Sequence, residues 1–269
     1  MQLFRSILSR RMLALILCAI LIYVNAFTSV KVFAKVCTNQ PAFRCTANKQ
    51  AEADQAHNNN LAITAKAGVL IDNASGRILY AKNKDKKLIP ASITKIMTLL
   101  LIFESIEQGK CKLEDKVTVS EYAASMGGSQ VFLEPGETQD VNTMIKCISI
   151  ASANDAAVAM AEHLAGSEQS FVKRMNKKAK ALGMKHTHFK NCNGLDDSIE
   201  SGHYSSAYDV ALMSQSLVSK YPDISKYSTV WMDAITHITK KGKKKFGLTN
   251  TKKLIRTYQG ITGLKTGST

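Results

Sequence analysis

The sequence predicts an α+β domain in which strands at both ends flank a helical middle. Extended apolar runs occur near residue 67 and again after residue 229, and the segments between them carry apolar residues at helical spacing. Apolar residues make up 45% of the 269 residues. This share is enough for a substantial core and excludes a disordered chain.

The first 34 residues are typical of an export signal. Three arginines within the first eleven residues form a basic head, an apolar run follows from Met12 to Val24, and Val32-Phe33-Ala34 places small or branched side chains before a cleavage site. The apolar run is short for a membrane span, and an uncleaved anchor is the alternative. We therefore expect an exported protein at the extracytoplasmic face of the cell membrane or in the cell wall.

The remainder of the chain is basic. Without residues 1–34 it has 32 basic and 21 acidic side chains, an excess of 11. Outside the cell, such an excess favours anionic polymers and headgroups. We expect no nucleic-acid partner, because an export signal directs the chain to a place where little nucleic acid exists. An anionic wall polymer or a membrane surface is the partner that the charge indicates.

Cysteine and histidine give little indication of a metal. Five cysteines follow the signal, an odd number with no C-x-x-C pair. Cys37 and Cys45 either close a small loop in an oxidising compartment or remain unpaired thiols. His186 and His188 form H-x-H without an evident third ligand nearby. We expect neither a metal nor another cofactor.

The order of elements follows from periodicity and turn residues. Residues 35–64 lack periodicity and are typical of a linker, so the folded domain is expected over 65–269. A hairpin is predicted from strands at 67–72 and 77–81 with a turn at Asn73–Gly76. Helices are expected at 92–108, 140–151, 154–164, 167–182 and 205–220. Strands are expected at 229–236, 246–250 and 263–269. The lysine-rich run 240–245 is predicted to be a solvated hairpin tip, with binding of an anionic wall polymer as the alternative.

Two S-x-x-K motifs occur, and their contexts differ. Ser92-Ile-Thr-Lys95 follows Pro90-Ala91 and opens a helix that is apolar almost all round, which places it in the middle of the domain. Ser170-Phe-Val-Lys173 lies within an amphipathic helix, where the lysine is expected to be solvated. The first motif is therefore the chemical candidate.

Ser92 and Lys95 suit nucleophilic catalysis. A serine hydroxyl is a poor nucleophile until a base takes its proton, and the i, i+3 spacing puts Lys95 on the same helix face. Burial against the apolar helix would lower the pKa of Lys95, and the helix N-terminus would favour negative charge on a carbonyl oxygen under attack. The alternative is a plain N-cap serine with a surface lysine.

Two later motifs complete a set. Ser152 and Asn154 lie in a predicted break between helices, where the hydroxyl can relay a proton and the amide can bond a substrate amide and a lysine. A simple helix cap is the alternative interpretation. Lys265-Thr266-Gly267 offers a cation, a hydroxyl and room for close approach, which suits a substrate carboxylate. Its alternative is an ordinary exposed lysine.

In this order, S-x-x-K, S-x-N and K-T-G resemble the signature of penicillin-binding proteins and serine β-lactamases. From about Ala65 to the last residue, the chain is similar to the low-molecular-mass D-alanyl-D-alanine carboxypeptidases of peptidase family S11. The segments that carry this likeness are Leu70–Tyr80, Pro90–Thr98, Gly127–Ser129, Gly183–Phe189, Asn193–Asp196, His203–Asp209 and Gly263–Thr269.

The resemblance implies a transpeptidase-like fold and a peptidoglycan stem peptide ending in D-Ala-D-Ala as the substrate. Ser92 would form the acyl-enzyme and release the terminal D-alanine, with Lys95 as the base. Ser152 would relay a proton, and Asn154 would bind the substrate amide and the lysine. β-Lactams would acylate Ser92 because they mimic the substrate. Carboxypeptidase and endopeptidase activity would share this site.

The resemblance also implies how the substrate is held. Lys265 and Thr266 would bind its terminal carboxylate, and Gly267 would leave room along the strand. The backbone N–H groups of Ser92 and Ser268 would form the oxyanion hole.

The likeness has one departure. In the family, further strands and a helix follow K-T-G, whereas this sequence ends at Thr269, so we interpret it as C-terminally truncated, with an unpaired strand edge. An inactive remnant or a non-catalytic wall-binding protein is therefore an alternative. A class A β-lactamase is a further one. Those enzymes need E-x-x-x-N after S-x-N, which is not found between Asn154 and Lys265, and they usually carry Asp at the position of Ala153.

Overall fold

The structure is a computed structural model, and it describes residues 61–196, 201–240 and 242–268. The signal expected at 1–34, residues 35–60 of the expected linker, and the Cys37 and Cys45 pair lie outside the described residues. In the described ranges, no helix combines the length and the apolar content that crossing a membrane requires.

The N-terminal hairpin forms as predicted. Strands β1 (Gly68–Ile71) and β2 (Ile78–Lys82) pair antiparallel, with an irregularity in register between Leu70 and Ile71. The turn between them is held by the backbone N–H and the hydroxyl of Ser75, which both donate to the Asp72 carboxylate. In an Asx-type turn, the aspartate side chain accepts a hydrogen bond from a nearby backbone N–H and so takes the place of a backbone–backbone bond.

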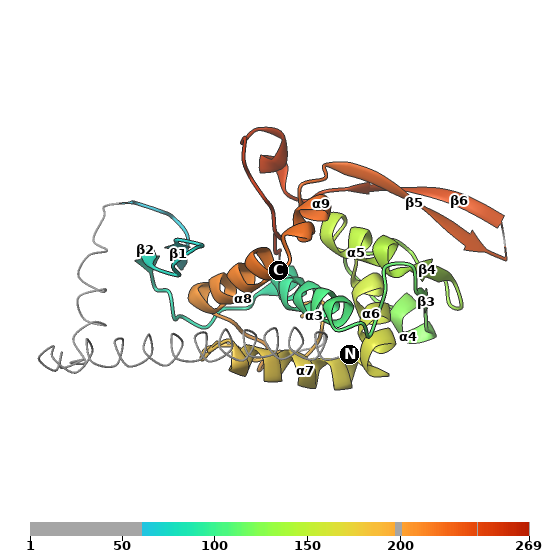
Figure 1. Cartoon of the computed structure of the whole chain (residues 1–269), viewed down its shortest axis with the longest axis horizontal. Coiled ribbons are helices and arrows are strands. Elements are labelled where there is room, and N and C mark those ends of the chain that lie inside the picture. The colour runs from blue at the N-terminus through green and yellow to red at the C-terminus, as the bar shows by residue number, and fades with distance from the viewer. Residues whose placement is uncertain (1–60, 197–200, 241, 269) are drawn as a thin grey trace, which may run out of the picture. The chain divides into compact units, whose positions relative to one another are not determined.

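The helix α3 (Lys95–Glu107) is the centre of the core, as its all-round apolar sequence predicts. Its apolar residues from Ile96 to Ile102 are each at most 3% exposed. Four other helices surround it (Figure 1): α5 (Val141–Ile150), α6 (Asn154–Ala165), α7 (Glu168–Ala181) and α8 (Ala207–Lys220). Burial of each such side chain stabilises the fold by about 1.5–3 kcal/mol before entropy is counted.

The ends of these helices follow from their capping residues. Asp140 before α5, Ser167 before α7 and Ser206 before α8 each accept a hydrogen bond from the backbone N–H three residues on. These bonds satisfy donors that the first helical turn leaves free. Gly166 ends α6 in the left-handed region, at φ 76°.

Short elements escaped prediction from periodicity. Strands β3 (Lys116–Thr118) and β4 (Thr138–Asp140) pair antiparallel, and α4 (Glu121–Ala124) is a single turn. Elements of three or four residues are shorter than the window in which a period can be recognised. Further short helical turns are η2 (Pro222–Ile224), α9 (Ser225–Ser228) and η3 (Lys253–Arg256).

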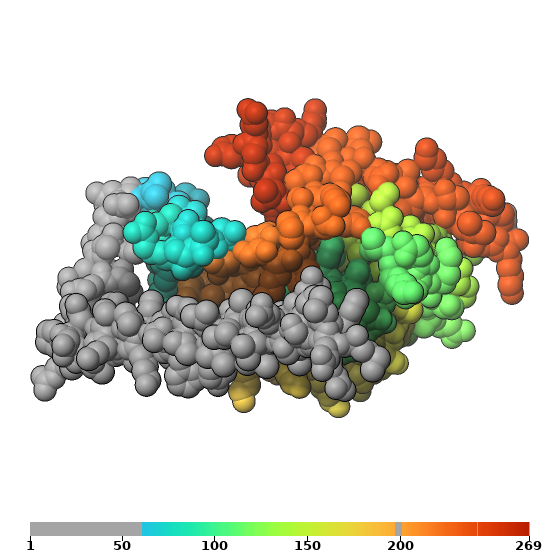
Figure 2. Space-filling model, viewed as in Figure 1, coloured from blue at the N-terminus to red at the C-terminus, as the bar shows by residue number. Residues whose placement is uncertain are grey.

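A long hairpin of β5 (Met232–Thr239) and β6 (Gly242–Thr249) extends from the helical part, in orange in Figures 1 and 2. Two details of its prediction were wrong. The first strand begins at Met232 rather than at 229, because α9 occupies 225–228. Lys243 to Lys245 lie inside β6, paired with β5, and are exposed there rather than at the tip.

The prediction of a strand over 263–269 was also wrong. Residues 263–268 have no regular secondary structure and join no strand ladder within the described residues. The described sheets are therefore three separate two-stranded sheets, β1–β2, β3–β4 and β5–β6. The mixture of helices and antiparallel strands agrees with the predicted α+β class.

Candidate active site

Ser92 lies in a 3-10 turn, η1 (Ala91–Thr94), that leads directly into α3. We expected the α-helix to begin at Ser92, but it begins three residues later. The preceding Ala91 has φ 47°, a left-handed conformation that is uncommon for a residue with a side chain. Because the turn precedes the α-helix, it presents the half-buried Ser92 side chain at the helix entrance.

Two distant segments hold this turn. Gly194 packs so closely on it that an added Cβ would lie 1.8 Å from the Ala91 carbonyl oxygen. His203 Nδ1 accepts from the backbone N–H of Lys190 at 3.1 Å, so the ring hydrogen is on Nε2 and donates to Thr94 Oγ1 at 2.8 Å. Burial lowers the pKa of His203 to about 4, which keeps this tautomer neutral.

Lys95 is the first residue of α3 and is completely buried. Its Nζ lies 3.2 Å from Ser92 Oγ, 2.6 Å from Asn154 Oδ1 and 2.7 Å from the Asn193 carbonyl oxygen. Burial, followed by the positive charge of Lys265, lowers the pKa of Lys95 to about 7. The alternative of a surface lysine is therefore wrong.

The three partners of Lys95 Nζ suit a neutral amine. Two of them, the oxygens of Asn154 and Asn193, can only accept, and a neutral amine has two N–H groups to give them. The third partner, the Ser92 hydroxyl oxygen at 3.2 Å, accepts from a charged lysine, and its hydroxyl can donate to Nζ once the lysine is neutral. In its neutral form, Lys95 can therefore accept the Ser92 proton while the two asparagine oxygens keep its N–H groups.

Asn154, the first residue of α6, is held so that its oxygen faces Lys95. Its Nδ2 donates to the Gly127 carbonyl oxygen at 2.8 Å, and its backbone N–H donates to the Ser129 carbonyl oxygen at 2.7 Å. Gly128 lies between these two contacts, and a Cβ there would come within 2.9 Å of Asn154 Nδ2. The amide cannot flip without losing the bond to Gly127.

Ser152 lies in the break between α5 and α6, two residues before Asn154. It has φ 62° and is 3% exposed. Among the described residues, its hydroxyl makes no hydrogen bond with Ser92 or Lys95. The predicted break is present, because α5 ends at Ile150 and α6 begins at Asn154. The left-handed backbone at Ser152 produces the change of direction between these helices.

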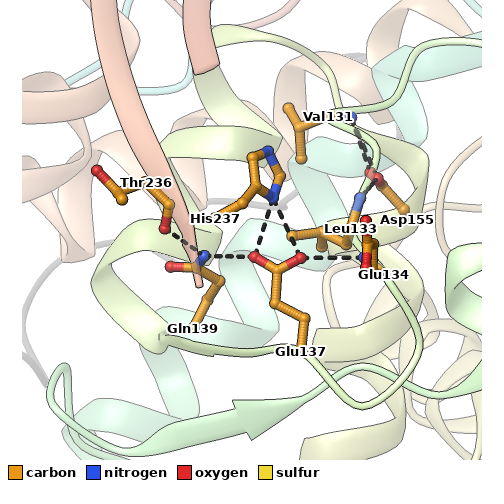
Figure 3. A network of polar contacts seen from close by, with 8 residues as sticks. All are labelled: Val131, Leu133, Glu134, Glu137, Gln139, Asp155, Thr236 and His237. Atoms are coloured by element: carbon orange, nitrogen blue, oxygen red, sulfur yellow. Dashed lines mark hydrogen bonds and ion pairs between the residues drawn. The ribbon is translucent and has the colours of Figure 1, made fainter. Parts of the chain in front are cut away.

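A polar network behind this break holds the segment that binds Asn154 (Figure 3). The buried Asp155 carboxylate accepts from the backbone N–H groups of Val131 and Leu133, each at 3.1 Å. Burial raises the pKa of Asp155, although these hydrogen bonds oppose the rise. The network therefore ties residues 131–133, just after the Gly127–Ser129 segment, to the start of α6.

The same network reaches the long hairpin. Glu137 Oε1 lies 2.9 Å from His237 Nδ1 on β5 and accepts from Gln139 Nε2 at 2.7 Å (Figure 3). Gln139 Nε2 also donates to the Thr236 carbonyl oxygen at 2.9 Å. These contacts fix β5 against β4, beside the segment that holds Asn154.

The 265–267 segment lies against the Ser92 turn. A Cβ on Gly267 would meet the Pro90 carbonyl oxygen at 3.0 Å and Ile93 Cγ1 at 3.1 Å, so only a glycine fits comfortably. The positive charge of Lys265 contributes to the lowered pKa of Lys95. Burial and the charge of Lys252 lower the pKa of Lys265 itself to about 8.

The rest of this segment is less enclosed. Lys265 Nζ donates to the Thr266 carbonyl oxygen at 3.0 Å, and Thr266 Oγ1 lies 2.5 Å from Thr251 Oγ1. Gly267 and Ser268 are exposed. The tertiary structure thus brings Ser92, Lys95, Asn154 and the K-T-G residues together, while the second S-x-x-K stays apart, with Lys173 exposed on α7.

Sequence reasoning missed three residues that shape the site. The Asn193 carbonyl binds Lys95, Gly194 supports the turn at Ala91, and His203 binds Thr94. Two of the segments that carry the family likeness, Asn193–Asp196 and His203–Asp209, contain these residues, but the sequence analysis assigned them no chemical role. A role played by a backbone carbonyl or by a glycine cannot be recognised from the residue type in the sequence.

Comparison with known proteins decides the family. The sequence profile of peptidase S11, described as D-alanyl-D-alanine carboxypeptidase, matches residues 50–269. The chain belongs to this family. It is 54% identical over 219 residues to the D-alanyl-D-alanine carboxypeptidase DacF of Bacillus subtilis, covering 81% of this chain and 54% of that protein. It is 42% identical over 167 residues to DacA of Escherichia coli, covering 60% of this chain and 41% of that protein.

Solved structures show the same fold as this S11 chain. The D-alanyl-D-alanine carboxypeptidase DacD of Francisella tularensis matches with a TM-score of 0.69 and 29% identity, over 86% of this chain and 66% of that one. Penicillin-binding protein D2 of Listeria monocytogenes, solved in its ampicillin-bound form, matches with a TM-score of 0.61 and 32% identity, over 78% and 81%. The predicted penicillin-binding, transpeptidase-like fold is confirmed. The chain spans about half the length of the curated relatives that it matches.

Proposed function

We propose that this chain carries the active site of a serine-type D-Ala-D-Ala carboxypeptidase. Its substrate is a peptidoglycan stem peptide, and Ser92 forms the acyl-enzyme. The observation that carries the proposal is the contact of Ser92 Oγ with a fully buried Lys95 whose pKa lies near 7. A lysine with such a pKa is neutral in a large fraction at neutral pH and can act as a general base. Membership of the S11 family supports the substrate class.

In the proposed acylation, Ser92 Oγ bonds to the carbonyl carbon of the penultimate D-alanine while its proton passes to Lys95 Nζ. Collapse of the tetrahedral intermediate breaks the C–N bond, and the leaving D-alanine amine takes a proton from Lys95 through the Ser152 hydroxyl. Water then attacks the ester and frees Ser92. Asn154 holds Lys95 throughout, and its amide is also the partner of the substrate backbone.

Substrate binding falls to the 265–268 segment. Lys265 and Thr266 bind the terminal carboxylate, and Gly267 lets the segment approach the Ser92 turn. The backbone N–H groups of Ser92 and Ser268 stabilise the oxyanion. Donors of this kind act on the charge that develops in the transition state, where removing one costs about 100- to 1000-fold in rate.

Four further assignments belong to the same proposal. Residues 65–269 form the D,D-peptidase domain, after a signal at 1–34 and a linker at 35–64. The chain acts outside the cytoplasm. β-Lactams acylate Ser92 as substrate mimics. The excess of basic side chains favours an anionic wall polymer or membrane surface as a neighbour.

The test is release of D-alanine from a tripeptide ending in D-Ala-D-Ala, together with gel labelling by a fluorescent penicillin. We expect both activities in the unaltered chain, loss of both in Ser92→Ala, and retention of both in Ser170→Ala. The control variant removes the serine of the other S-x-x-K motif. Lack of release and labelling in the unaltered, folded chain would instead favour a non-catalytic wall-binding protein. Many turnovers of a chromogenic cephalosporin would favour a β-lactamase.

A further inference from the structure

Three side chains of metal-ligand type meet at the end of the helical part that is remote from Ser92. Cys111 lies in the loop after α3, Asp115 lies in the turn before β3, and His163 lies in the last turn of α6. Their thiol, carboxylate and imidazole ligand atoms all lie within 4.8 Å of one another. Cys111 is buried, Asp115 is partly buried and His163 is exposed. The cluster thus opens to solvent on the histidine side, which provides an entry path.

The spacing and chemistry of this cluster suit zinc. In a tetrahedral site, ligand atoms at ordinary zinc distances lie roughly 3.3–3.7 Å apart, so a small closure of these side chains suffices. A thiolate with an imidazole favours zinc and related soft cations over magnesium and calcium, which take oxygen ligands. Three protein ligands leave a fourth position for water.

The surroundings also favour a cation. His163 lies at the C-terminal end of α6, where the helix dipole attracts positive charge. A cation held among the three side chains would also offset the negative charge of the Asp115 carboxylate. The loop itself is shaped by Asp115, which accepts from the backbone N–H of Lys112 at 2.8 Å.

We propose that Cys111, Asp115 and His163 bind one zinc ion, which joins the loop after α3 to the end of α6. The expectation of no metal rested on the lack of a C-x-x-C pair and of a third ligand near His186 and His188, and it missed residues that are distant in sequence. Helix α3 has 13 residues and is therefore about 20 Å long, so the ion lies a helix length from Lys95.

The role of this zinc ion is structural. Lys95 and Asn154 are the first residues of α3 and α6, and the ion connects the far ends of the same two helices. It therefore stabilises the pair of helices that carries the site without contacting substrate. Coordination releases the thiol proton of Cys111 to solvent, so affinity falls as pH falls.

The experiment uses the full chain, kept reduced by a reductant that does not coordinate metals. Cobalt titration should produce thiolate-to-cobalt charge-transfer absorption at one ion per chain, and zinc should displace the cobalt. Zinc at a hundred times its Kd should raise the Tm by about 5 °C or more. His163→Gln should weaken zinc binding by about tenfold or more, and Cys111→Ser should abolish the charge-transfer band.

Two variants serve as matched controls. Cys147→Ala removes another buried cysteine, and His186→Gln removes a histidine of the H-x-H pair. Both should bind cobalt as the unaltered chain does. His163 is exposed, so its replacement should leave the fold intact. The proposal is overturned if the chain shows no thiolate band, or if the controls weaken binding as much as His163→Gln does.

Discussion

Asn154 Oδ1 lies 2.6 Å from Lys95 Nζ, and the other end of the same amide donates to the Gly127 carbonyl oxygen at 2.8 Å. The amide is therefore locked with its oxygen toward the lysine. Together with the Asn193 carbonyl, it occupies both N–H groups of a neutral Lys95. In that form the lone pair of Lys95 is available to the Ser92 hydroxyl, and the neutral Asn154 amide does not favour the charged lysine as a carboxylate would.

The first prediction concerns the neutrality of Asn154. In Asn154→Asp, a carboxylate would replace the amide oxygen and raise the pKa of Lys95 by favouring its charged form. We expect the rate of acylation by a fluorescent penicillin at pH 7 to fall by about tenfold or more. The rate should recover partly at higher pH. Asn142→Asp, on α5, is the control, and equal rates in the two variants would contradict the proposed role.

The second prediction is the pH dependence of acylation by a substrate with a terminal carboxylate. The rate should rise as Lys95 loses its proton near pH 7 and fall as Lys265 loses its proton near pH 8. The positive charges of Lys95 and Lys265 interact, so the two apparent pKa values of the profile belong to the pair of lysines and not to either one alone. The profile should therefore be bell-shaped with a narrow maximum.

Lys252 provides the test of the alkaline limb. Its charge contributes to the low pKa of Lys265, so Lys252→Gln should move that limb to higher pH. The acid limb should stay in place. A profile that keeps rising above pH 9, or an alkaline limb that Lys252→Gln leaves unmoved, would argue against charged Lys265 as the carboxylate partner.

The third prediction concerns the approach of the 265–267 segment to the Ser92 turn. In Gly267→Ala, the new Cβ would crowd the Pro90 carbonyl oxygen at 3.0 Å and push the segment away. Misplacement by about 1 Å can cost about 100-fold in rate, and contacts of 3.0 and 3.1 Å require a smaller shift, so we expect a loss of about threefold to tenfold in penicillin acylation. The Tm should change little, because Gly267 is exposed. Gly247→Ala, where nothing lies within 4 Å of the added Cβ, should keep the full rate.

The fourth prediction concerns stability in acid. The pKa of His203 is about 4 in the folded chain and 6.5 ordinarily, so the unfolded chain binds more protons between these values. Stability from this group is complete above about pH 6.5 and is lost as the pH falls toward 4, by about 2–3 kcal/mol. Urea unfolding at pH 7, 5.5 and 4.5 measures this loss.

His203→Gln tests the assignment. A glutamine can accept from the Lys190 N–H and donate to Thr94 as the neutral imidazole does, but it does not titrate. The variant should lose less stability than the unaltered chain over the same pH range. His186→Gln, which replaces a partly exposed histidine 3.7 Å from the Asp85 carboxylate, is the comparison variant. Equal slopes in all three proteins would refute the role of His203.

Much of the fold and site followed from local patterns. The apolar run after Ser92 predicted a central helix because only burial on all sides satisfies such a surface. The apolar surroundings of Ser92 also distinguished its S-x-x-K motif from the one at Ser170. The structure agrees, because Lys95 is buried whereas Lys173 is exposed. The order of motifs also indicated the S11 family, which the family profile confirmed.

Other features depend on contacts between distant segments. The 3-10 turn at Ser92 is held by Gly194 and His203, about a hundred residues away in the chain. The Lys243–Lys245 run lies within β6 rather than at a tip, because strand pairing with β5 decides its place. The Cys111, Asp115 and His163 cluster has no local spacing that would mark it as a site.

The sequence by itself determined the class of fold, the central helix and the family, because hydrophobic periodicity and motif order are local properties of the chain. Only the tertiary structure decided which oxygens hold Lys95, and how far burial and the charge of Lys265 lower its pKa. Desolvation and the electrostatic effect of a neighbouring charge depend on distances through space, and these distances exist only once the chain has folded.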